Sequence, residues 1–395
     1  EDPAANEESS GSAADVKIGL ICVHDINSGY DAAHIEGLTA ACEEFGIDAN
    51  SQVIFRYNIA EDENCYDAAV DLAEEGCNII FSDSYGHQSY MLDAAEDYPD
   101  VTFVSCTGDM AATSGLDNYK NLFPYTYESR YVSGVVAGMK LKELMDAGTV
   151  TDPKIGYVGA FPYAEVVSGY TSFYLGAKSV CPSVTMDVTF TGSWYDETLE
   201  KEGAQKLIAG GCKLISQHAD SLGAPTACEN AGVPNVSYNG STITAGPNTY
   251  IISSRIDWAP YYEMAIKAVM DGTEIPADYT GNLSTGSVVL TDLNTAVAAE
   301  GTQAAIDAAK AKLESGELHV FDCSTFTVSG ANVKDTMKVD ADGHLTSYMA
   351  DVNTDEAYTG DTEVVHDGYF SESEFRSAPY FDLFIDGINT LDTAF

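Results

Sequence analysis

The sequence contains one short pattern twice, and this duplication restricts the folds open to the chain. Lys17–Ile21 (KIGLI) returns as Lys154–Val158 (KIGYV), and Ser28-Gly29-Tyr30 returns as Ser168-Gly169-Tyr170. Three more pairs follow in the same order and at nearly the same spacing: Gly76–Ile80 with Gly211–Ile215, Ala94–Glu96 with Ala227–Glu229, and Val104-Ser105 with Val236-Ser237. Solenoid repeats have periods of roughly 20–50 residues, which is much shorter than the spacing between the two copies of this pattern. The pattern therefore predicts two lobes with a common plan, and a cleft between them for a small ligand.

The first copy predicts a strand, a turn and a helix. Ile18–Val23 is an apolar run that is too short for a membrane span, which is typical of a buried parallel strand. Ser28 stands three residues before Asp31, so the pair is placed to form a capping box at a helix start. Apolar residues then recur at helical spacing, at Ile35, Leu38, Cys42 and Phe45. In open α/β sheets ligands bind beyond the carboxyl ends of such strands, where Tyr30 lies.

Composition excludes several classes of protein. The chain has 395 residues, enough for two or three domains. Its formal charge is −44, which argues against binding to nucleic acid or to an anionic membrane surface. We interpret the charge as a solvated acidic surface. The nine cysteines form no CxxC motif or Cys/His cluster, which argues against zinc. Disulfides stay open, but four cysteines lie in or beside apolar runs and are interpreted as small buried hydrophobes: Cys22, Cys77, Cys106 and Cys212.

The sequence pattern predicts no membrane span and no signal peptide within these residues. The stretch nearest to a span, Tyr131–Met145, is interrupted by charged residues. Residues 1–15 are acidic and nearly devoid of bulky apolar side chains, which predicts a disordered tether. Such a tail fits a mature exported protein whose signal has been removed, and a cloning remnant is the alternative.

We predict an α/β fold with two Rossmann-like lobes. The first lobe comprises residues 16–122 and 256–294, and the second comprises 123–255. Residues 295–395 are predicted to cross between the lobes and to pack on them. A long helix is predicted over Tyr127–Ala147, with Gly134 and Gly138 four residues apart. Glycine inside a helix costs roughly 1 kcal/mol relative to alanine, so we expect another element to approach this smooth face closely.

The C-terminal hundred residues carry weaker patterns. Short strands are predicted at Leu318–Phe321 and Phe326–Val328. Asp351–Phe375 is acidic and aromatic, and its pattern fits no element. Phe381–Phe395 is predicted to end the chain as an amphipathic segment.

Five stretches carry a resemblance to a known family: NSGYDAAHIEGL, YESRYVSGVVAG, GSWYD, GGCKLISQHADS and KLESGELHVF. The chain resembles the basic-membrane-protein (BMP) family of ABC-transporter substrate-binding lipoproteins, the purine nucleoside receptor group. The resemblance covers about residues 16–325. It implies the periplasmic-binding-protein type I fold, with crossover hinges and a ligand enclosed between the lobes. It also implies an ABC permease as partner, and an extracytoplasmic protein anchored to the cell membrane by lipid.

The chain departs from the family pattern at two places. Nucleoside binders of the family usually carry Phe in the first loop, where this chain has Gly29 and Tyr30. The combination of Gly29, Tyr30 and His34 is similar to a subgroup linked to free purine bases or related heterocycles. Ser254, Arg255 and Asp257 occupy the region where family members often place a ribose-binding Lys. The resemblance therefore implies a purine base or nucleoside as ligand, without settling ribose recognition.

Two aromatic residues are the candidates for holding a flat ligand. Tyr30 follows the first strand, and Trp194 follows the predicted strand Val184–Phe190 in the second lobe. An ordinary surface or core tyrosine is the alternative for Tyr30. Trp258 lies near a predicted hinge, where it either caps the ligand or packs in the core.

Six polar residues just past predicted strands are candidates for reading the ligand's edge, because carboxylates and amides bond ring N–H and amino groups. They are Asp25, Asn27, Ser84, Asp109, Asp220 and Asn239. Each alone is more often a helix cap or a turn residue. His34 and His218 are interpreted as packing or loop histidines.

We expect a binding protein rather than an enzyme. The sequence contains no G-x-S-x-G, HExxH, Walker or G-x-G-x-x-G motif, and we expect no cofactor or metal. Alternatives are a binding protein for another flat heterocycle such as a flavin, a sensor ectodomain of the same fold, and a cleft enzyme. The expected oligomeric state is a monomer.

Overall fold

The computed structural model describes residues 12–352, 360 and 362–391, and it divides into two compact units. The first unit comprises the chain up to residue 26, residues 34–123 and residues 258–279. The second comprises residues 27–33, 124–257 and 280–395. Residues 27–33 and 280–294 thus fall in the second unit, instead of in the first lobe to which the sequence assigned them. Residues 295–395 also group with the second unit.

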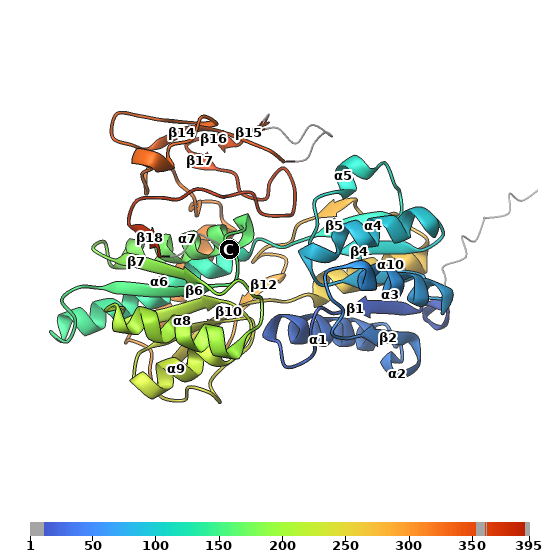
Figure 1. Cartoon of the computed structure of the whole chain (residues 1–395), viewed down its shortest axis with the longest axis horizontal. Helices are drawn as coiled ribbons and strands as arrows, with labels where there is room; N and C mark the ends of the chain where they lie inside the picture. Colours follow the sequence, from blue (N-terminus) through green and yellow to red (C-terminus); the bar gives the residue numbers. More distant parts are fainter. Residues whose placement is uncertain (1–11, 353–359, 361, 392–395) are drawn as a thin grey trace, which may run out of the picture. The chain divides into compact units, whose positions relative to one another are not determined.

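The first unit contains a six-stranded parallel sheet (Figure 1). Its strands are β1 (Ile18–Ile21), β2 (Val53–Arg56), β3 (Ile79–Ser82), β4 (Thr102–Ser105), β5 (Tyr119–Leu122) and β11 (Asp278–Tyr279). Its helices are α1 (Gly29–Glu44, whose first turn groups with the second unit), α2 (Ala49–Gln52), α3 (Glu63–Glu74), α4 (Gln88–Asp97), α5 (Ala111–Ser114) and α10 (Ala259–Asp271). The strand order is β11-β5-β4-β3-β1-β2.

The second unit contains a seven-stranded sheet in the order β12-β10-β9-β8-β6-β7-β18. Its strands are β6 (Lys154–Gly159), β7 (Thr185–Phe190), β8 (Leu214–His218), β9 (Asn235–Tyr238), β10 (Tyr250–Ile256), β12 (Val288–Leu290) and β18 (Ile388–Thr390). All neighbours are parallel except β10 and β12. Its helices are α6 (Thr126–Asp146), α7 (Ala164–Val180), α8 (Glu197–Ala209), α9 (Gly223–Ala231) and α11 (Thr302–Glu314).

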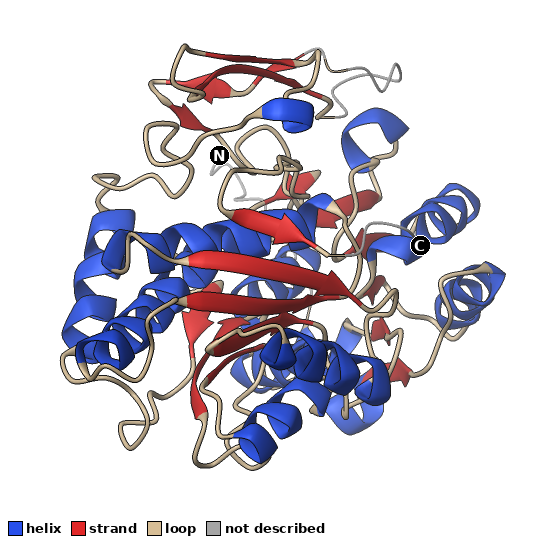
Figure 2. Ribbon diagram, turned by 60° about the vertical axis from the view of Figure 1, so that its left-hand side comes forward, coloured by secondary structure: helices blue, strands red, loops and turns tan. Residues whose placement is uncertain are grey.

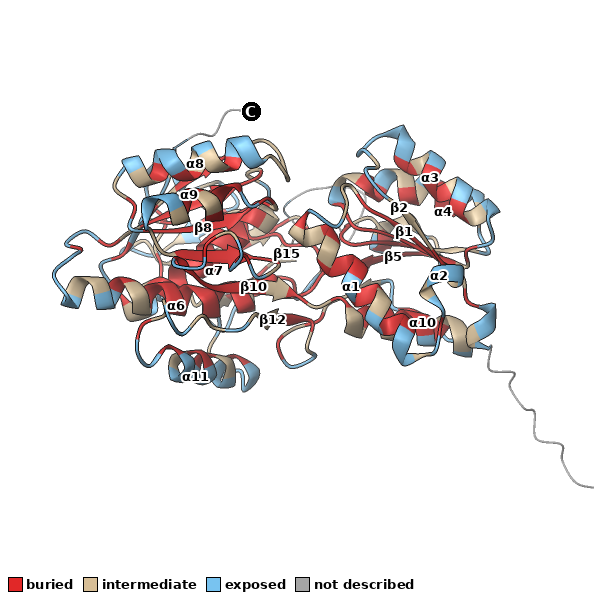
Figure 3. Cartoon of the chain, turned by 90° about the horizontal axis from the view of Figure 1, so that it is seen from below, coloured by how far each residue is buried: buried red, intermediate tan, exposed pale blue. Residues whose placement is uncertain are grey.

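Helices cover both faces of this sheet (Figure 2). Helices α6 and α7 pack on one face, and α8 and α9 pack on the other. The strands are almost fully buried, whereas the outer faces of the helices are exposed (Figure 3). The two separate sheets confirm the predicted α/β fold with two lobes of common plan.

The duplicated motif marks the inner strands β1 and β6. Its glycine, Gly19 or Gly156, is the second or third residue of the strand. A Cβ on Gly19 would lie 2.8 Å from Leu72 Cδ1, and one on Gly156 would lie 2.6 Å from Ile215 Cδ1. Glycine is needed in both copies because neighbouring side chains pack directly against the strand backbone.

The glycines of α6 confirm the predicted close approach. A Cβ on Gly134 would overlap the carbonyl group of Phe173 on α7, and one on Gly138 would lie 2.6 Å from the carbonyl oxygen of Ala177. On the facing side, a Cβ on Gly176 would overlap the carbonyl group of Tyr131. The two helix backbones therefore touch where side chains are absent.

The C-terminal region completes the second unit. It forms the three-stranded sheet of β13 (Met337–Val339), β14 (Leu345–Ala350) and β15 (Thr362–Glu363), and the pair β16 (Val365–His366) and β17 (Tyr369–Phe370). The final strand, β18, pairs in parallel with β7. The core of the unit continues into this region through residues such as Phe326, Tyr348 and Phe381.

Two predicted strands of this region are wrong. Residues 318–321 and 326–328 form no strand, apart from a single bridge at the next residue, Asp322. Phe321 and Phe326 are buried against the ring of Phe381 instead, so their apolar pattern reflects core packing without a ladder partner. Part of the unassigned stretch, residues 353–359 and 361, lies outside the described residues. So do residues 1–11 of the predicted tether, while Ala13–Asp15 forms a short 3-10 turn.

Other predictions can be compared directly. All nine cysteines lie in the described part of the chain, are buried, and form no disulfide. Among the described helices, none combines the length and the apolar character that a bilayer crossing requires.

Candidate functional site

Strand order locates a candidate site at the same place in each unit. In the order β2-β1-β3 and in the order β7-β6-β8, successive connections leave the inner strand in opposite directions. Doubly wound sheets bind ligands at this switch point, beyond the carboxyl ends of the two strands where the order reverses. These strands are β1 and β3 in the first unit, and β6 and β8 in the second.

An aromatic group gathers at the switch point of the second unit. It consists of Phe161 and Tyr163 after β6, Trp194 after β7, His218 at the end of β8 and Tyr238 at the end of β9. The ring centroid of Phe161 lies 5.1 Å from that of Tyr163 and 5.2 Å from that of Trp194. The His218 ring lies 6.5 Å from Trp194 and 4.6 Å from Tyr238. These contacts form a continuous aromatic surface along the sheet edge.

Two predicted polar residues stand beside the aromatic group. Asn239 Nδ2 donates to Asp220 Oδ1 at 2.9 Å, and the Asp220 N–H donates to the Trp194 carbonyl at 3.0 Å. The Gly29 N–H donates to the Asp220 carbonyl at 3.3 Å. The structure thus brings Trp194, Asp220 and Asn239 together.

The carboxyl of Asp220 lies in an unusual environment. Burial raises its pKa well above the ordinary value, and the nearby carboxylates of Glu200 and Asp31 act in the same direction. Burial also raises the pKa of Glu200, to about 7. A protonated Asp220 offers both a donor and an acceptor, which suits the edge of a neutral heterocycle.

Asn27 and Tyr30 belong to the segment 27–33 of the second unit. One half of the predicted capping box is present, because Ser28 Oγ accepts from the Asp31 N–H at 3.4 Å. Ser28 Oγ also donates to Asp31 Oδ2 at 2.5 Å. Asn27 is exposed and Tyr30 is half-buried. A ligand stacked between Tyr30 and Trp194 stays a prediction.

The other predicted site residues lie in the first unit. Asp25 is half-buried after β1. Ser84 donates to Glu61 Oε1 at 2.5 Å, and Asp109 accepts from the Tyr85 hydroxyl at 2.8 Å. The binding role of these three residues stays a prediction.

Trp258 is 1% exposed and begins α10. Its ring stacks on His34 with centroids 3.8 Å apart, and His34 Nδ1 lies 2.6 Å from the Tyr262 hydroxyl. This environment agrees with the packing alternative for Trp258. It also agrees with the packing role expected of His34.

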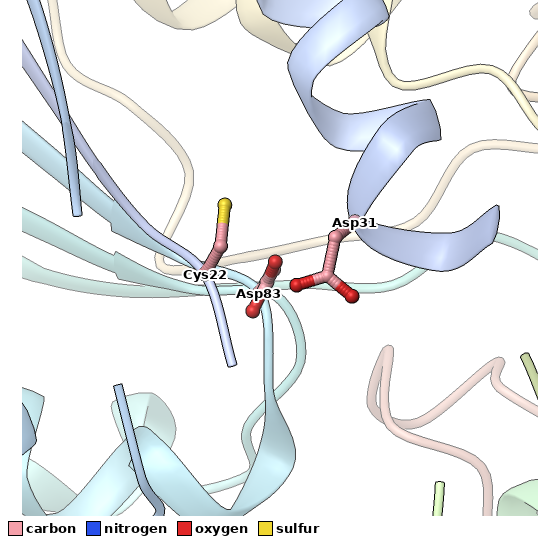
Figure 4. Close-up of side chains that lie close together, drawn as sticks. All are labelled: Cys22, Asp31 and Asp83. Carbon is pink, nitrogen blue, oxygen red and sulfur yellow. The ribbon is translucent and has the colours of Figure 1, made fainter. Parts of the chain in front are cut away.

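The switch point of the first unit holds a thiol and a carboxyl. The sulfur of Cys22, which follows β1, lies within 4.8 Å of a carboxylate oxygen of Asp83, which follows β3. Figure 4 shows both side chains together with Asp31, which lies in the first turn of α1. Asp83 Oδ1 accepts from the Val23 N–H at 2.9 Å. One thiol and one carboxyl supply two donors, whereas a structural zinc site requires four.

Sequence reasoning missed Phe161, Tyr163 and Tyr238. The signal that was missed is the aromatic pair Phe161 and Tyr163, which stands in the loop directly after β6, the strand of the second motif copy. Arg130 was also missed as a site residue, although it interrupts the apolar run of α6 at the residues with the most specific family pattern.

The comparisons agree with this architecture. Residues 16–320 match the family model of the PnrA-like ABC transporter substrate-binding proteins, Bmp. A purine-binding protein of Brucella abortus is 30% identical over 270 residues, which are 68% of this chain and 73% of that protein. A Haloferax volcanii protein, provisionally named an ABC transporter glucose-binding protein, is 32% identical over 254 residues, 64% of this chain and 61% of its own length.

A solved structure supports the same assignment. The solute-binding protein of an ABC transporter system from Conexibacter woesei superposes with a TM-score of 0.62 at 25% identity. The match covers 77% of this chain and 98% of that protein. Proteins of this class are extracytoplasmic and bind a solute and a membrane permease. The chain therefore belongs to the Bmp family of PnrA-like ABC transporter substrate-binding proteins.

Proposed function

We propose that this protein captures a purine base or nucleoside and delivers it to the permease of an ABC importer. The observation that carries the proposal is the aromatic group after β6 and β7, which stands beside the bonded pair of Asp220 and Asn239. A flat heterocycle gains dispersion and stacking from rings such as Trp194. The carboxyl of Asp220 and the amide of Asn239 supply the donors and acceptors that its edge requires.

The Brucella abortus relative is named for purine binding, which supports this ligand class. Tyr30 is proposed as the second stacking ring. Asp25, Asn27, Ser84 and Asp109 are proposed to complete the polar contacts, and Trp258 is retained as a cap on the ligand. We further propose that the protein acts as a monomer without catalysis, anchored by lipid at the outer face of the cell membrane.

A neutral sugar is the second candidate, because the Haloferax volcanii relative is provisionally named for glucose. A pyranose ring also packs on Trp194, and its hydroxyl groups bond to carboxyl and amide groups of the same kind. The two candidates differ in what they demand of Tyr30. A purine is aromatic on both faces and gains from a second ring, whereas a hydroxyl-rich sugar gains less.

Titration calorimetry with adenine, guanine, adenosine, guanosine, inosine, riboflavin and glucose tests the proposal. At least one purine is expected to bind more tightly than about 100 μM, which corresponds to roughly −5.5 kcal/mol. Binding of glucose alone would transfer the assignment to the sugar. Binding of riboflavin alone would favour the flavin alternative.

Single substitutions test the site itself. Trp194→Ala and Tyr30→Ala are each expected to weaken purine binding by more than about 1 kcal/mol. Phe375→Ala is the matched control, because Phe375 is an exposed aromatic residue in the C-terminal region. Unchanged affinity in both site variants would remove the stacking arrangement.

A further inference from the structure

A buried arginine lies behind the aromatic group. Arg130 on α6 is 0% exposed. Its Nη1 donates to the Gln217 carbonyl at 2.9 Å, and its guanidinium carbon lies 3.6 Å from the centroid of the Tyr238 ring. Among the described residues, Nε and Nη2 have no hydrogen-bond acceptor, and no carboxylate forms an ion pair with Arg130. A cation buried without a counter-ion is costly, so its charge acts strongly on the groups around it.

The nearest titratable ring on the site side is His218. Its centroid lies 4.6 Å from Tyr238, the ring on which Arg130 stacks. His218 is 2% exposed, and its Nε2 lies 3.1 Å from Glu165 Oε1. A carboxylate only accepts hydrogen bonds, so this contact requires a proton on Nε2. The second nitrogen, Nδ1, faces α7, where a Cβ on Gly169 would lie 2.8 Å away.

We propose that Arg130 is a positioning residue whose charge keeps His218 neutral as the Nε2–H tautomer bonded to Glu165, so that the aromatic wall of the site carries no charge. A proton on Nδ1 would place a second cation near the guanidinium, with no acceptor to receive the new N–H. Glu165 opposes Arg130, because a carboxylate favours the charged ring. Burial is the larger cause and the charge of Arg130 adds to it, and together they lower the pKa of His218 to about 4.

The other groups around His218 do not supply a charge. Tyr238 on β9 lies against its ring, and the centroid of the Tyr157 ring on β6 lies 5.8 Å from the guanidinium carbon of Arg130. Burial raises the pKa of both phenols. Asp220 follows His218 on the same loop, and its pKa is raised as described above. Burial thus favours the uncharged form of each of these groups in the wall beneath the ligand. A neutral wall selects uncharged rings, such as free bases and nucleosides, and this selectivity rests on the proposed function.

Nitrogen-15 NMR of the histidine rings tests the electrostatic part without any ligand. The wild-type protein is expected to show His218 as a neutral Nε2–H tautomer that does not titrate between pH 8 and pH 5. Arg130→Met removes the charge at similar length, and it is expected to raise the pKa of His218 by about one unit. Arg130→Lys keeps the charge and is expected to leave the titration low.

Lys142→Met is the matched control, because Lys142 lies on the same helix and is exposed. An Nδ1–H tautomer in the wild-type protein would overturn the proposal even if the Arg130 variants fail to fold. So would a folded Arg130→Met variant in which His218 titrates as in the wild type.

Adenosine affinity measured from pH 5 to pH 8 tests the selectivity part. Wild-type affinity is expected to fall by only about a tenth at pH 5, because a His218 pKa of about 4 leaves about a tenth of the rings protonated there. Arg130→Met is expected to lose about twofold at pH 5, because a pKa raised by one unit leaves about half of the rings protonated. A parallel pH dependence in the two proteins would refute the selectivity. Absence of adenosine binding at any pH would refute the proposed function alone, since the NMR result is independent of it.

Discussion

Glu372 offers the sharpest test of how the C-terminal region is held in the second unit. The residue is 1% exposed, and its Oε2 accepts from the Tyr380 N–H at 3.3 Å. Its Oε1 has no hydrogen-bond donor among the described residues. Its carbonyl oxygen accepts from the Tyr127 hydroxyl at 3.1 Å, which ties this loop to the start of α6. Burial raises the pKa of Glu372 from 4.5 to about 8.

The sign of the effect follows from linkage. The folded state holds the proton more tightly than the unfolded state, so the contribution of Glu372 to stability is greatest below pH 4.5 and is lost as the pH rises to about 8. At about 1.36 kcal/mol per pKa unit, the full loss is about 5 kcal/mol above pH 8 and about 3 kcal/mol at pH 7. The substitution Glu372→Gln keeps the shape and the acceptor but cannot ionise.

We expect Glu372→Gln to match the wild type at pH 4.5 and to exceed its stability at pH 8.5 by several kcal/mol. The assay is urea unfolding at both pH values, followed by Trp194 fluorescence in a Trp258→Phe background so that only the second unit reports. Glu128 and Glu200 also have a pKa of about 7, so the difference between variant and parent is the informative quantity.

Glu374→Gln is the matched control, because Glu374 is an exposed carboxylate in the same loop. It is expected to change stability equally at both pH values. The reasoning fails if Glu372→Gln gives no additional stability at pH 8.5 relative to pH 4.5.

Three further results are expected. Gly176→Ala forces a methyl group into the carbonyl of Tyr131 and should cost about 2–3 kcal/mol in the free energy of unfolding. Gly203→Ala on α8 should cost much less, because its Cβ would meet only the end of a side chain, Thr189 Cγ2 at 3.3 Å, so equal effects in the two variants would contradict the helix contact. Ser28→Ala removes the cap on Asp31 and should lower stability by about 1 kcal/mol in calorimetry, so an unchanged Tm would argue against it. Raising KCl from about 0.1 to 1 M shortens the screening length from about 10 to 3 Å. Because the chain has 62 acidic and 18 basic residues, weaker repulsion between the carboxylates should raise Tm, and a fall in Tm would refute the role of repulsion.

The fold was predictable where the sequence obeys a local rule twice. The duplicated KIG motif located β1 and β6, because Gly19 and Gly156 meet the same need for close packing against a strand. The glycines of α6 likewise predicted the contact with α7. The second repeated tripeptide was a weaker guide. Ser28 directly precedes α1, whereas Ser168 lies inside α7, so the same tripeptide occupies different helical positions.

The site was predictable only in part. Trp194, Asp220 and Asn239 were found because each directly follows a strand, a position that sequence patterns reveal. Arg130 and Tyr238 were not, since their importance depends on a stacking contact between residues far apart in the chain. The strands after residue 336 other than β14 were missed because two or three residues are too few to show alternation.

The pairing of β18 with β7 has a practical consequence for anyone who shortens this chain. Ile388–Thr390 occupies the outer hydrogen-bonding edge of β7. Removal of the last eight residues would uncover a row of backbone donors and acceptors, which is a template for strand addition from another molecule. Such a truncated protein should self-associate as its concentration rises, and a fusion partner is better attached through a flexible spacer than directly at Thr390.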